Sequence, residues 1–288
     1  MKKLFLVSAV ALMVAGPAFG WGRVGHETVA KIAEDHLTDN ARKALKKYLG
    51  EDTIVSISSD ADVYRAFWTI DLGFVPSNPD DARLSWLKAF DFSTPRNISP
   101  VSHSVSVDTD FVSPRTDNLN GAYINNAAYY VDQYAKELKE GAESMDPEMR
   151  KRKISIIVHI LGDMHCPMHI VYLDRDPLKG TFKVKINGRE TTLHKWWDGG
   201  IFTAEGIYCF TDAAHLADIK TEEEIREISR GDIFDWVHET AVDSWPAHQV
   251  KPGDEKDVTY SVQMRPILLR QLRNGGYRLA ALLNSIFE

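Results

Sequence analysis

The chain has 288 residues, of which 44% are hydrophobic and 26% are charged, a balance that is ordinary for a globular protein. This composition excludes general disorder, collagen-like repeats and a polytopic membrane protein. With 34 Lys and Arg against 41 Asp and Glu, the formal net charge is -7. That charge argues against a nucleic-acid binder that works through a large basic surface.

The first twenty residues have the pattern of a signal peptide. Lys2 and Lys3 form a positive start, residues 4–15 are almost entirely apolar, and Ala18-Phe19-Gly20 supplies the small residues that a signal peptidase reads. The apolar run is too short to span a bilayer comfortably, so an uncleaved anchor is the weaker interpretation. We therefore expect residues 1–20 to be removed and the product to be exported, either to a periplasm or out of the cell.

Cleavage after Gly20 changes the chain that remains. Residues 21–288 have a net charge of -9, because Lys2 and Lys3 are lost, and Trp21 acquires a free α-amino group. No second long apolar run follows, so we expect no stable association with a membrane. No repeat, linker or charge block divides this part of the chain, and we expect a single domain that acts as a monomer.

The first half of the remaining chain is mostly helical in pattern. Apolar residues at helical spacing predict helices over residues 24–37 and 38–49. A loop-rich stretch with many Pro, Ser, Asp and Asn residues covers residues 74–120. Strong helical patterns then predict helices at 122–138 and 147–164.

The second half contains the one departure from helical periodicity. Residues 181–193 alternate apolar and polar side chains around Asn187-Gly188, which is typical of a β-hairpin. Helical patterns return at 222–228, 233–245 and 260–287. The sequence therefore predicts a mainly α, multi-helix domain with one small β-hairpin.

Residues 159–169 hold the densest chemical signal, with the sequence HILGDMHCPMH. On a helix, residues four apart share a face, so His159 and Asp163 can reach one metal ion. Pro167 should then end the helix and redirect His169. The alternative for an isolated His/Asp pair at this spacing is an ion pair on a helix surface.

A second pair, His194 and Asp198, repeats the four-residue spacing just after the predicted hairpin. Imidazole and carboxylate ligands without thiolate suit zinc in a catalytic site. Two further pieces stand at a distance: Trp21 to His26 (WGRVGH) opens the mature chain, and Asp62 lies in the stretch ADVYR. The α-amino group of Trp21 has an ordinary pKa of about 8, so a metal ion can displace its proton near neutrality.

These motifs resemble the S1/P1 nuclease family. The resemblance rests on Trp21-Gly-x-x-Gly-His26, His159-x-x-Gly-Asp163-x-x-x-Pro-x-His169 and Thr192-Leu-His194-x-x-Trp-Asp198, in that order along the chain. It implies a secreted, mainly α-helical enzyme with the phospholipase C/P1 nuclease-like fold, whose catalytic domain would be residues 21–288. It also implies three zinc ions, which would add about six positive charges where phosphate binds.

The resemblance also implies which residues hold the zinc ions. The resemblance implies that His103, the only histidine between His36 and His159, belongs to this set and that Asp163 bridges two of the ions. The implied ligands are Asp62, His103, His159 and Asp163 for the first ion; the amine and carbonyl of Trp21, His26 and Asp163 for the second; and His169, His194 and Asp198 for the third.

A mechanism follows from the same resemblance. A water bridging the close zinc pair would supply hydroxide, with Asp62 and Asp163 holding that pair and Arg65 near the phosphate. The alternative for Arg65 is a surface ion pair. The implied products are 5′-phosphorylated nucleotides from single-stranded RNA or DNA, and nucleosides from 3′-nucleotides.

Several alternatives stay open at this stage. Residues 174–180 and 104–108 depart from the family pattern around its base pocket, so a phospholipase C-like hydrolase on the same scaffold is the nearest rival. A metal-binding protein without turnover and a helical core with chance spacing are the others. Cys166 and Cys209 could pair in an oxidising compartment, which the sequence does not decide. We expect His36, His215, His238 and His248 to be surface or structural histidines, and His165 to support the metal site indirectly.

Overall fold

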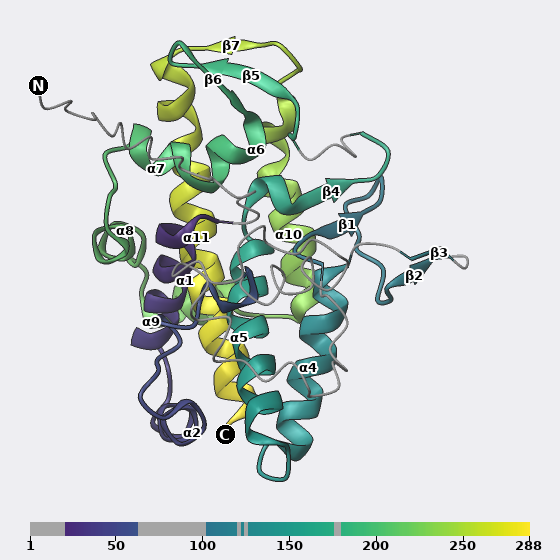
Figure 1. The fold of residues 1–288 in the computed structure, drawn as a ribbon, viewed down its shortest axis with the longest axis vertical. Coiled ribbons are helices and arrows are strands. Elements are labelled where there is room, and N and C mark those ends of the chain that lie inside the picture. Colours follow the sequence, from purple (N-terminus) through teal and green to yellow (C-terminus); the bar gives the residue numbers. More distant parts are fainter. Residues whose placement is uncertain (1–20, 63–101, 120–121, 124–125, 176–179) are drawn as a thin grey trace, which may run out of the picture.

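The computed structural model describes most of the chain that follows the predicted signal peptide (Figure 1). The signal peptide itself, Arg65 and much of the loop-rich stretch lie outside the described residues. The described residues are 21–62, 102–119, 122–123, 126–175 and 180–288.

Helix α5 (Pro147–Asp163) is the central element of the fold. Asp146 begins it by accepting a hydrogen bond from the Met149 amide, and Pro147 takes the first helical position, where its missing N–H costs nothing. Every residue from Lys153 to Asp163 is buried, so this half of α5 is covered all round. Asp163, the last residue of α5, therefore lies in the interior of the protein.

Four helices surround α5. Helix α1 (Arg23–Asp35) and the long α11 (Val258–Ile286) pack on one another and on α5, while α4 (Ala127–Gly141) and α2 (Asp39–Leu49) contact it as well (Figure 1). A Cβ at Gly276 of α11 would lie 2.5 Å from Cβ of Ile32 on α1. Glycine is therefore what lets α11 approach α1 so closely.

The predicted helices are confirmed, with small differences in their bounds. The exception is α4, which begins at Ala127 and not at residue 122. Ala122–Tyr123 instead forms β3, paired with β2 (Asn118–Leu119). The Asn126 amide also donates to the carbonyl oxygens of Pro114 and Thr116, which holds this residue in the loop before α4. The other confirmed helices are α9 (Glu222–Ile228) and α10 (Ile233–Ser244).

Several short helices were not predicted. Most of them have only three to five residues, too few to show a repeating apolar face, and one of them contains a Gly-Gly pair. They are η2 (Pro167–His169), α6 (Leu193–Lys195), η3 (Trp196–Gly200), α7 (Ile201–Ala204), α8 (Phe210–Ala217) and η4 (Trp245–Gln249).

The predicted β-hairpin is present, and a third strand joins it. Strands β5 (Lys183–Ile186) and β6 (Arg189–Thr192) are antiparallel, and Asn187 and Gly188 both have positive φ, at 51° and 75°. Two positive φ values identify a type I′ turn, the geometry that the Asn-Gly pair favours. Strand β7 (Glu255–Lys256) pairs with β5 in parallel, so a three-stranded sheet covers one end of the helices (Figure 1).

The sheet formed by β1 and β4 has more bearing on function. Strand β1 (Val105–Val107) pairs in parallel with β4 (Ile170–Tyr172), with Val105 opposite Ile170. His103 and His169 stand just before these two strands. The pairing therefore brings two distant histidines to the same end of one sheet.

The mainly α fold class is confirmed. The buried apolar side chains of the described residues form one continuous core that includes all the long helices. Among the described residues, no helix has both the length and the apolar character that crossing a membrane requires.

Candidate metal centre

Asp163 lies at the centre of a cluster of histidines. Its carboxylate is fully buried, with Oδ1 3.3 Å from Nε2 of His26 and Oδ2 3.0 Å from Nδ1 of His103 and 3.2 Å from Nε2 of His159. The three histidines come from α1, from the loop before β1 and from α5. One carboxylate thus faces ring nitrogens from three separate parts of the chain.

Asp62 adds a second carboxylate to this cluster. Its Oδ1 lies 3.6 Å from Nδ1 of His103 and 3.7 Å from Nε2 of His159, and its side chain is 40% exposed. Two overlapping groups result: His26, His159 and Asp163, and Asp62, His103 and His159, each with its donor atoms within 4.8 Å of one another. Each group has the composition and the spacing to hold a metal ion.

A hydrogen bond to the backbone fixes the orientation of the His159 ring. Its Nδ1 lies 2.7 Å from the carbonyl oxygen of Ser58, so Nδ1–H donates there and Nε2 is left to face the cluster. The ring of His26 stacks on the ring of His159, with centroids 3.8 Å apart. A Cβ at Gly162 would lie 2.9 Å from Nδ1 of His26. The glycine of the 159–169 motif therefore makes room for the imidazole of His26.

Trp21 lies beside the same cluster, held by two glycines. It is 1% exposed, its ring packs edge-on against Phe202, and a Cβ at Gly25 would lie only 2.7 Å from the Trp21 Cβ. The Gly22 amide donates to the carbonyl oxygen of Asp198 at 2.6 Å, and a Cβ at Gly22 would lie 2.7 Å from that oxygen. The two glycines of the opening motif are thus explained by close contacts.

A third group forms around Asp198. Donor atoms of Cys166, His169 and Asp198 lie within 4.8 Å of one another, and Nε2 of His194 is 3.6 Å from Oδ2 of Asp198. Nδ1 of His169 contacts the carbonyl oxygen of His103 and lies 3.8 Å from Oδ2 of Asp163, which links this group to the first two. The sequence motifs did not identify Cys166 as a member, although it stands in the motif only three residues before His169.

Burial and neighbouring charges shift the pKa values of Asp163 and His159 in opposite directions. Burial raises the pKa of Asp163, but the surrounding histidines hold that pKa well below its ordinary value. Burial lowers the pKa of His159, yet the Asp163 carboxylate outweighs burial and raises it to about 9. Burial lowers the pKa of His26, and the nearby His159 lowers it further. Burial raises the pKa of Asp198 to about 9 and that of the Cys166 thiol well above its usual range.

A divalent cation fits this set of atoms. Oδ2 of Asp198 and Nδ1 of His26 are buried without a hydrogen bond, and the buried oxygens of Asp163 face ring nitrogens of several histidines at once. Such atoms are costly to bury unless a charge or a donor meets them. A cation beside them would allow neutral imidazoles and ionised carboxylates to coexist.

The other cysteine and the remaining histidines stand apart from the cluster. Cys166 and Cys209 are not joined by a disulfide, and the Cys209 sulfur instead lies 2.9 Å from Oγ1 of Thr211. His36 bonds to Asp218, and Nε2 of His248 lies 2.7 Å from the Pro167 carbonyl oxygen. Arg65, predicted to lie near the phosphate, is outside the described residues.

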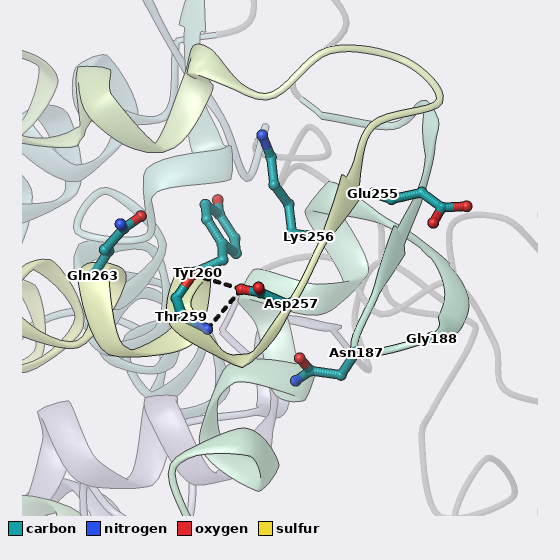
Figure 2. Close-up of a pocket in the computed structure, with 8 residues that line it drawn as sticks. All are labelled: Asn187, Gly188, Glu255, Lys256, Asp257, Thr259, Tyr260 and Gln263. Carbon is teal, nitrogen blue, oxygen red and sulfur yellow. Dashed lines mark hydrogen bonds between the residues drawn. The ribbon is translucent and has the colours of Figure 1, made fainter.

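A pocket lies beside the three-stranded sheet of β5, β6 and β7 (Figure 2). It is bordered by the turn of the hairpin, β7 and the first residues of α11, and Asp257 caps α11 there by accepting from the Thr259 amide. None of the predicted metal ligands is among its lining residues, which are Asn187, Gly188, Glu255, Lys256, Asp257, Thr259, Tyr260 and Gln263.

Comparison with known proteins agrees with this geometry. The family model described as S1/P1 Nuclease matches residues 21–288, which is almost the whole chain and includes all three groups. The chain belongs to the S1/P1 nuclease family. Members of the S1/P1 nuclease family are hydrolases of phosphodiester bonds, so this protein is an enzyme of that class and nucleic acid is its class of substrate.

Individual relatives cover nearly the full length. Endonuclease 2 of Arabidopsis thaliana is 27% identical over 305 residues, which cover 99% of this chain and 97% of the relative. Nuclease S1 of Aspergillus oryzae is 26% identical over 313 residues, which cover 99% and 98%. Nuclease P1 of Penicillium citrinum is 25% identical over 183 residues, which cover 62% and 57%. The similarity to S1/P1 nucleases is therefore distant in identity but extends over the whole chain for the first two.

Proposed function

We propose that residues 21–288 form an exported, zinc-dependent endonuclease. It hydrolyses single-stranded RNA and DNA to 5′-phosphorylated products and converts 3′-nucleotides to nucleosides. The observation that carries the proposal is the Asp163 carboxylate, whose two oxygens lie within 3.3 Å of ring nitrogens of three histidines. A buried carboxylate shared in this way is suited to bridge two cations.

We assign three zinc positions to the nine residues predicted as ligands. Three groups of donor atoms, each within 4.8 Å, support the proposal: His26, His159 and Asp163; Asp62, His103 and His159; and Cys166, His169 and Asp198. The positions are Asp62, His103, His159 and Asp163; Trp21, His26 and Asp163; and His169, His194 and Asp198.

The residues of this chain would do three things in the reaction. Zinc bound there would acidify water and neutralise charge on the phosphate. His159, oriented by the Ser58 carbonyl, would keep Nε2 directed at the cluster. Asp62, at 40% exposure, is the most accessible of the clustered carboxylates and would lie on the side from which substrate enters. Arg65 would contact the phosphate.

The proposal includes removal of residues 1–20. The match to the family begins at Trp21, the residue that follows the predicted cleavage site, and Trp21 is buried beside the cluster. A free amine on Trp21 would therefore be formed next to groups that hold metal. Adding one residue before Trp21 should remove the amine as a ligand, and full zinc content with full activity in that variant would contradict this assignment.

A panel of substrates tests the proposed activity. The mature protein, loaded with zinc, is incubated separately with single-stranded RNA, single-stranded DNA, 3′-AMP and phosphatidylcholine. We expect release of 5′-nucleotides from both nucleic acids and of phosphate from 3′-AMP. Lipid cleavage with no nucleotide release would overturn the proposal in favour of a phospholipase C-like enzyme, and bound zinc with no product from any substrate would indicate a metal-binding protein.

A further inference from the structure

Cys166 lies inside the third group of donors. Its sulfur is 4.0 Å from Oδ1 of Asp198, and the donor atoms of Cys166, His169 and Asp198 all lie within 4.8 Å of one another. All three residues are buried, with at most 1% of their surface exposed. A thiol at this place is close enough to share an ion with the imidazole and the carboxylate.

The turn after α5 is what brings the thiol there. Helix α5 ends at Asp163, and Pro167 then starts the short helix η2 (Pro167–His169). The His169 amide donates to the carbonyl oxygen of Cys166 at 2.9 Å, which closes the turn between these two residues. The same turn therefore presents both Cys166 and His169 to Asp198.

Asp198 supplies an independent sign that a cation belongs here. Its Oδ2 is buried without a hydrogen bond, and its side chain is 2% exposed. A buried carboxylate oxygen in that state is costly unless a positive charge meets it. The two oxygens of this carboxylate have different neighbours. The Cys166 sulfur lies 4.0 Å from Oδ1, and Nε2 of His194 lies 3.6 Å from Oδ2.

We propose that the Cys166 thiol is a ligand of the third zinc position, together with His169 and Asp198. The inference rests on the proposed function, because it assumes a metal ion at this position. On binding, the sulfur–zinc bond forms and the thiol proton leaves to solvent. Cys166, His169 and Asp198 supply three donors within 4.8 Å of one another, and Nε2 of His194 lies 3.6 Å from Oδ2 of Asp198.

This assignment changes how firmly the third ion is expected to be held. Thiolate favours softer metals than imidazole and carboxylate alone do. The third ion should therefore exchange more slowly than the other two and should be the first to be replaced by cadmium.

The alternative is that Cys166 packs in the core as a small apolar residue and binds no metal. Buried cysteines often have that role. The chain offers a matched control, because it has only two cysteines and Cys209 lies away from the group. Replacing either one by serine changes a single atom, so the two variants differ only in the place of the change.

X-ray absorption at the zinc edge decides between the two. The mature, zinc-loaded wild type and Cys209→Ser should both show a sulfur neighbour at about 2.3 Å besides nitrogen and oxygen neighbours at about 2.0–2.2 Å. Cys166→Ser should lose the sulfur neighbour, and its zinc content should fall from three ions per chain to two. Wild-type protein that binds zinc with nitrogen and oxygen neighbours alone would overturn the role of Cys166 and leave the proposed function standing. Protein that binds no zinc would contradict the proposed function itself.

A second measurement does not depend on the folding of Cys166→Ser. Cobalt-substituted Cys209→Ser has a single thiol, so a sulfur-to-cobalt charge-transfer band in the near ultraviolet can come only from Cys166. The band should appear as cobalt fills the third position and disappear when cadmium displaces it. Full cobalt loading without that band would overturn the proposal.

Discussion

Gly162 and His26 are in direct contact across two helices. A Cβ on Gly162 of α5 would lie 2.9 Å from Nδ1 of His26 on α1, closer than real Cβ atoms come to their neighbours. His26 in turn stacks on His159, one helical turn before Asp163. The absence of a side chain at one position of α5 thus sets where an imidazole of α1 stands relative to the central carboxylate.

Gly162→Ala should therefore damage the metal centre without unfolding the protein. The added methyl group displaces the His26 ring, and overpacking of this kind costs about 1–3 kcal/mol. We expect at least one zinc ion per chain to be lost and hydrolysis of single-stranded RNA to fall more than about tenfold, since 1.4 kcal/mol corresponds to a factor of ten. Zinc analysis and initial rates on the same preparation measure both effects.

Gly141→Ala is the matched control for that substitution. Gly141 ends α4, and a Cβ there would meet only Oγ of Ser144 at 3.6 Å, an ordinary contact. We expect unchanged zinc content and activity, with a small gain in stability because glycine is unfavourable in helices. Equal zinc content in Gly162→Ala and Gly141→Ala would refute the role given to Gly162.

Arg278 should be a main contributor to stability. Its guanidinium is buried on α11, lies 3.1 Å from Nε2 of His165, donates to the Ile228 carbonyl oxygen and pairs with Glu239. Nδ1 of His165 lies 2.8 Å from the Leu161 carbonyl oxygen, so Nε2 accepts from Arg278. The contact ties α11 to the end of α5. Arg278→Ala leaves the buried Nε2 of His165 without this donor, while Glu239 is 60% exposed and stays hydrated, so we expect a loss of about 1–3 kcal/mol in the free energy of unfolding.

Urea unfolding compares this variant with Arg230→Ala. Arg230 pairs with Glu227 at 2.7 Å, but its side chain is 77% exposed. Removing an exposed pair costs about 0–1 kcal/mol. Similar losses for the two variants would mean that the buried network around His165 does not stabilise the fold.

Asp232 should give α10 a pH-dependent cap. Its carboxylate accepts hydrogen bonds from the Phe234 and Asp235 amides, and the Asp232 amide donates a hydrogen bond to the Asp235 carboxylate. Burial raises the pKa of Asp232, but Arg115 and the two amides outweigh it and the net pKa is lowered. A carboxyl with a lowered folded-state pKa contributes stability above its unfolded pKa of about 3.9, and that stability is lost as the pH falls through the folded-state pKa.

Asp232→Ala should therefore cost about 1 kcal/mol at pH 7, the usual price of a lost cap. The difference from wild type should shrink below pH 4, because the wild-type carboxyl becomes protonated there. Thermal unfolding of metal-free protein at pH 7 and pH 3 measures this without interference from bound zinc. Asp232→Asn keeps a capping oxygen and should show a smaller loss at pH 7. A constant difference between wild type and Asp232→Ala across this range would contradict the role of the charge.

The sequence was most informative for features that depend on residues close together in the chain. The spacing of His159 and Asp163, and the position of Pro167 after them, predicted a helix that ends before Pro167, and α5 with η2 has that form. Asn187-Gly188 likewise predicted its own turn. Local patterns of this kind depend on a few neighbouring residues, so they can be read without knowledge of the rest of the fold.

Features that depend on distant contacts were not predictable in the same way. The meeting of His103 and His169 depends on the parallel pairing of two three-residue strands, β1 and β4, which are too short to show alternation. The late start of α4 depends on hydrogen bonds from Asn126 to the preceding loop. Cys166 was considered only as a disulfide partner because its approach to Asp198 is made by the turn and not by helical spacing.

The central claim is that the clustered carboxylates and histidines hold the metal that hydrolysis requires. The most direct test measures zinc content and the rate of single-stranded RNA hydrolysis in one preparation of mature protein that begins at Trp21, before and after chelation. We predict three zinc ions per chain, loss of activity as they are removed, and recovery when zinc is restored. Fewer than one zinc ion per chain in a preparation with full activity, or activity that survives complete removal of metal, would contradict the account.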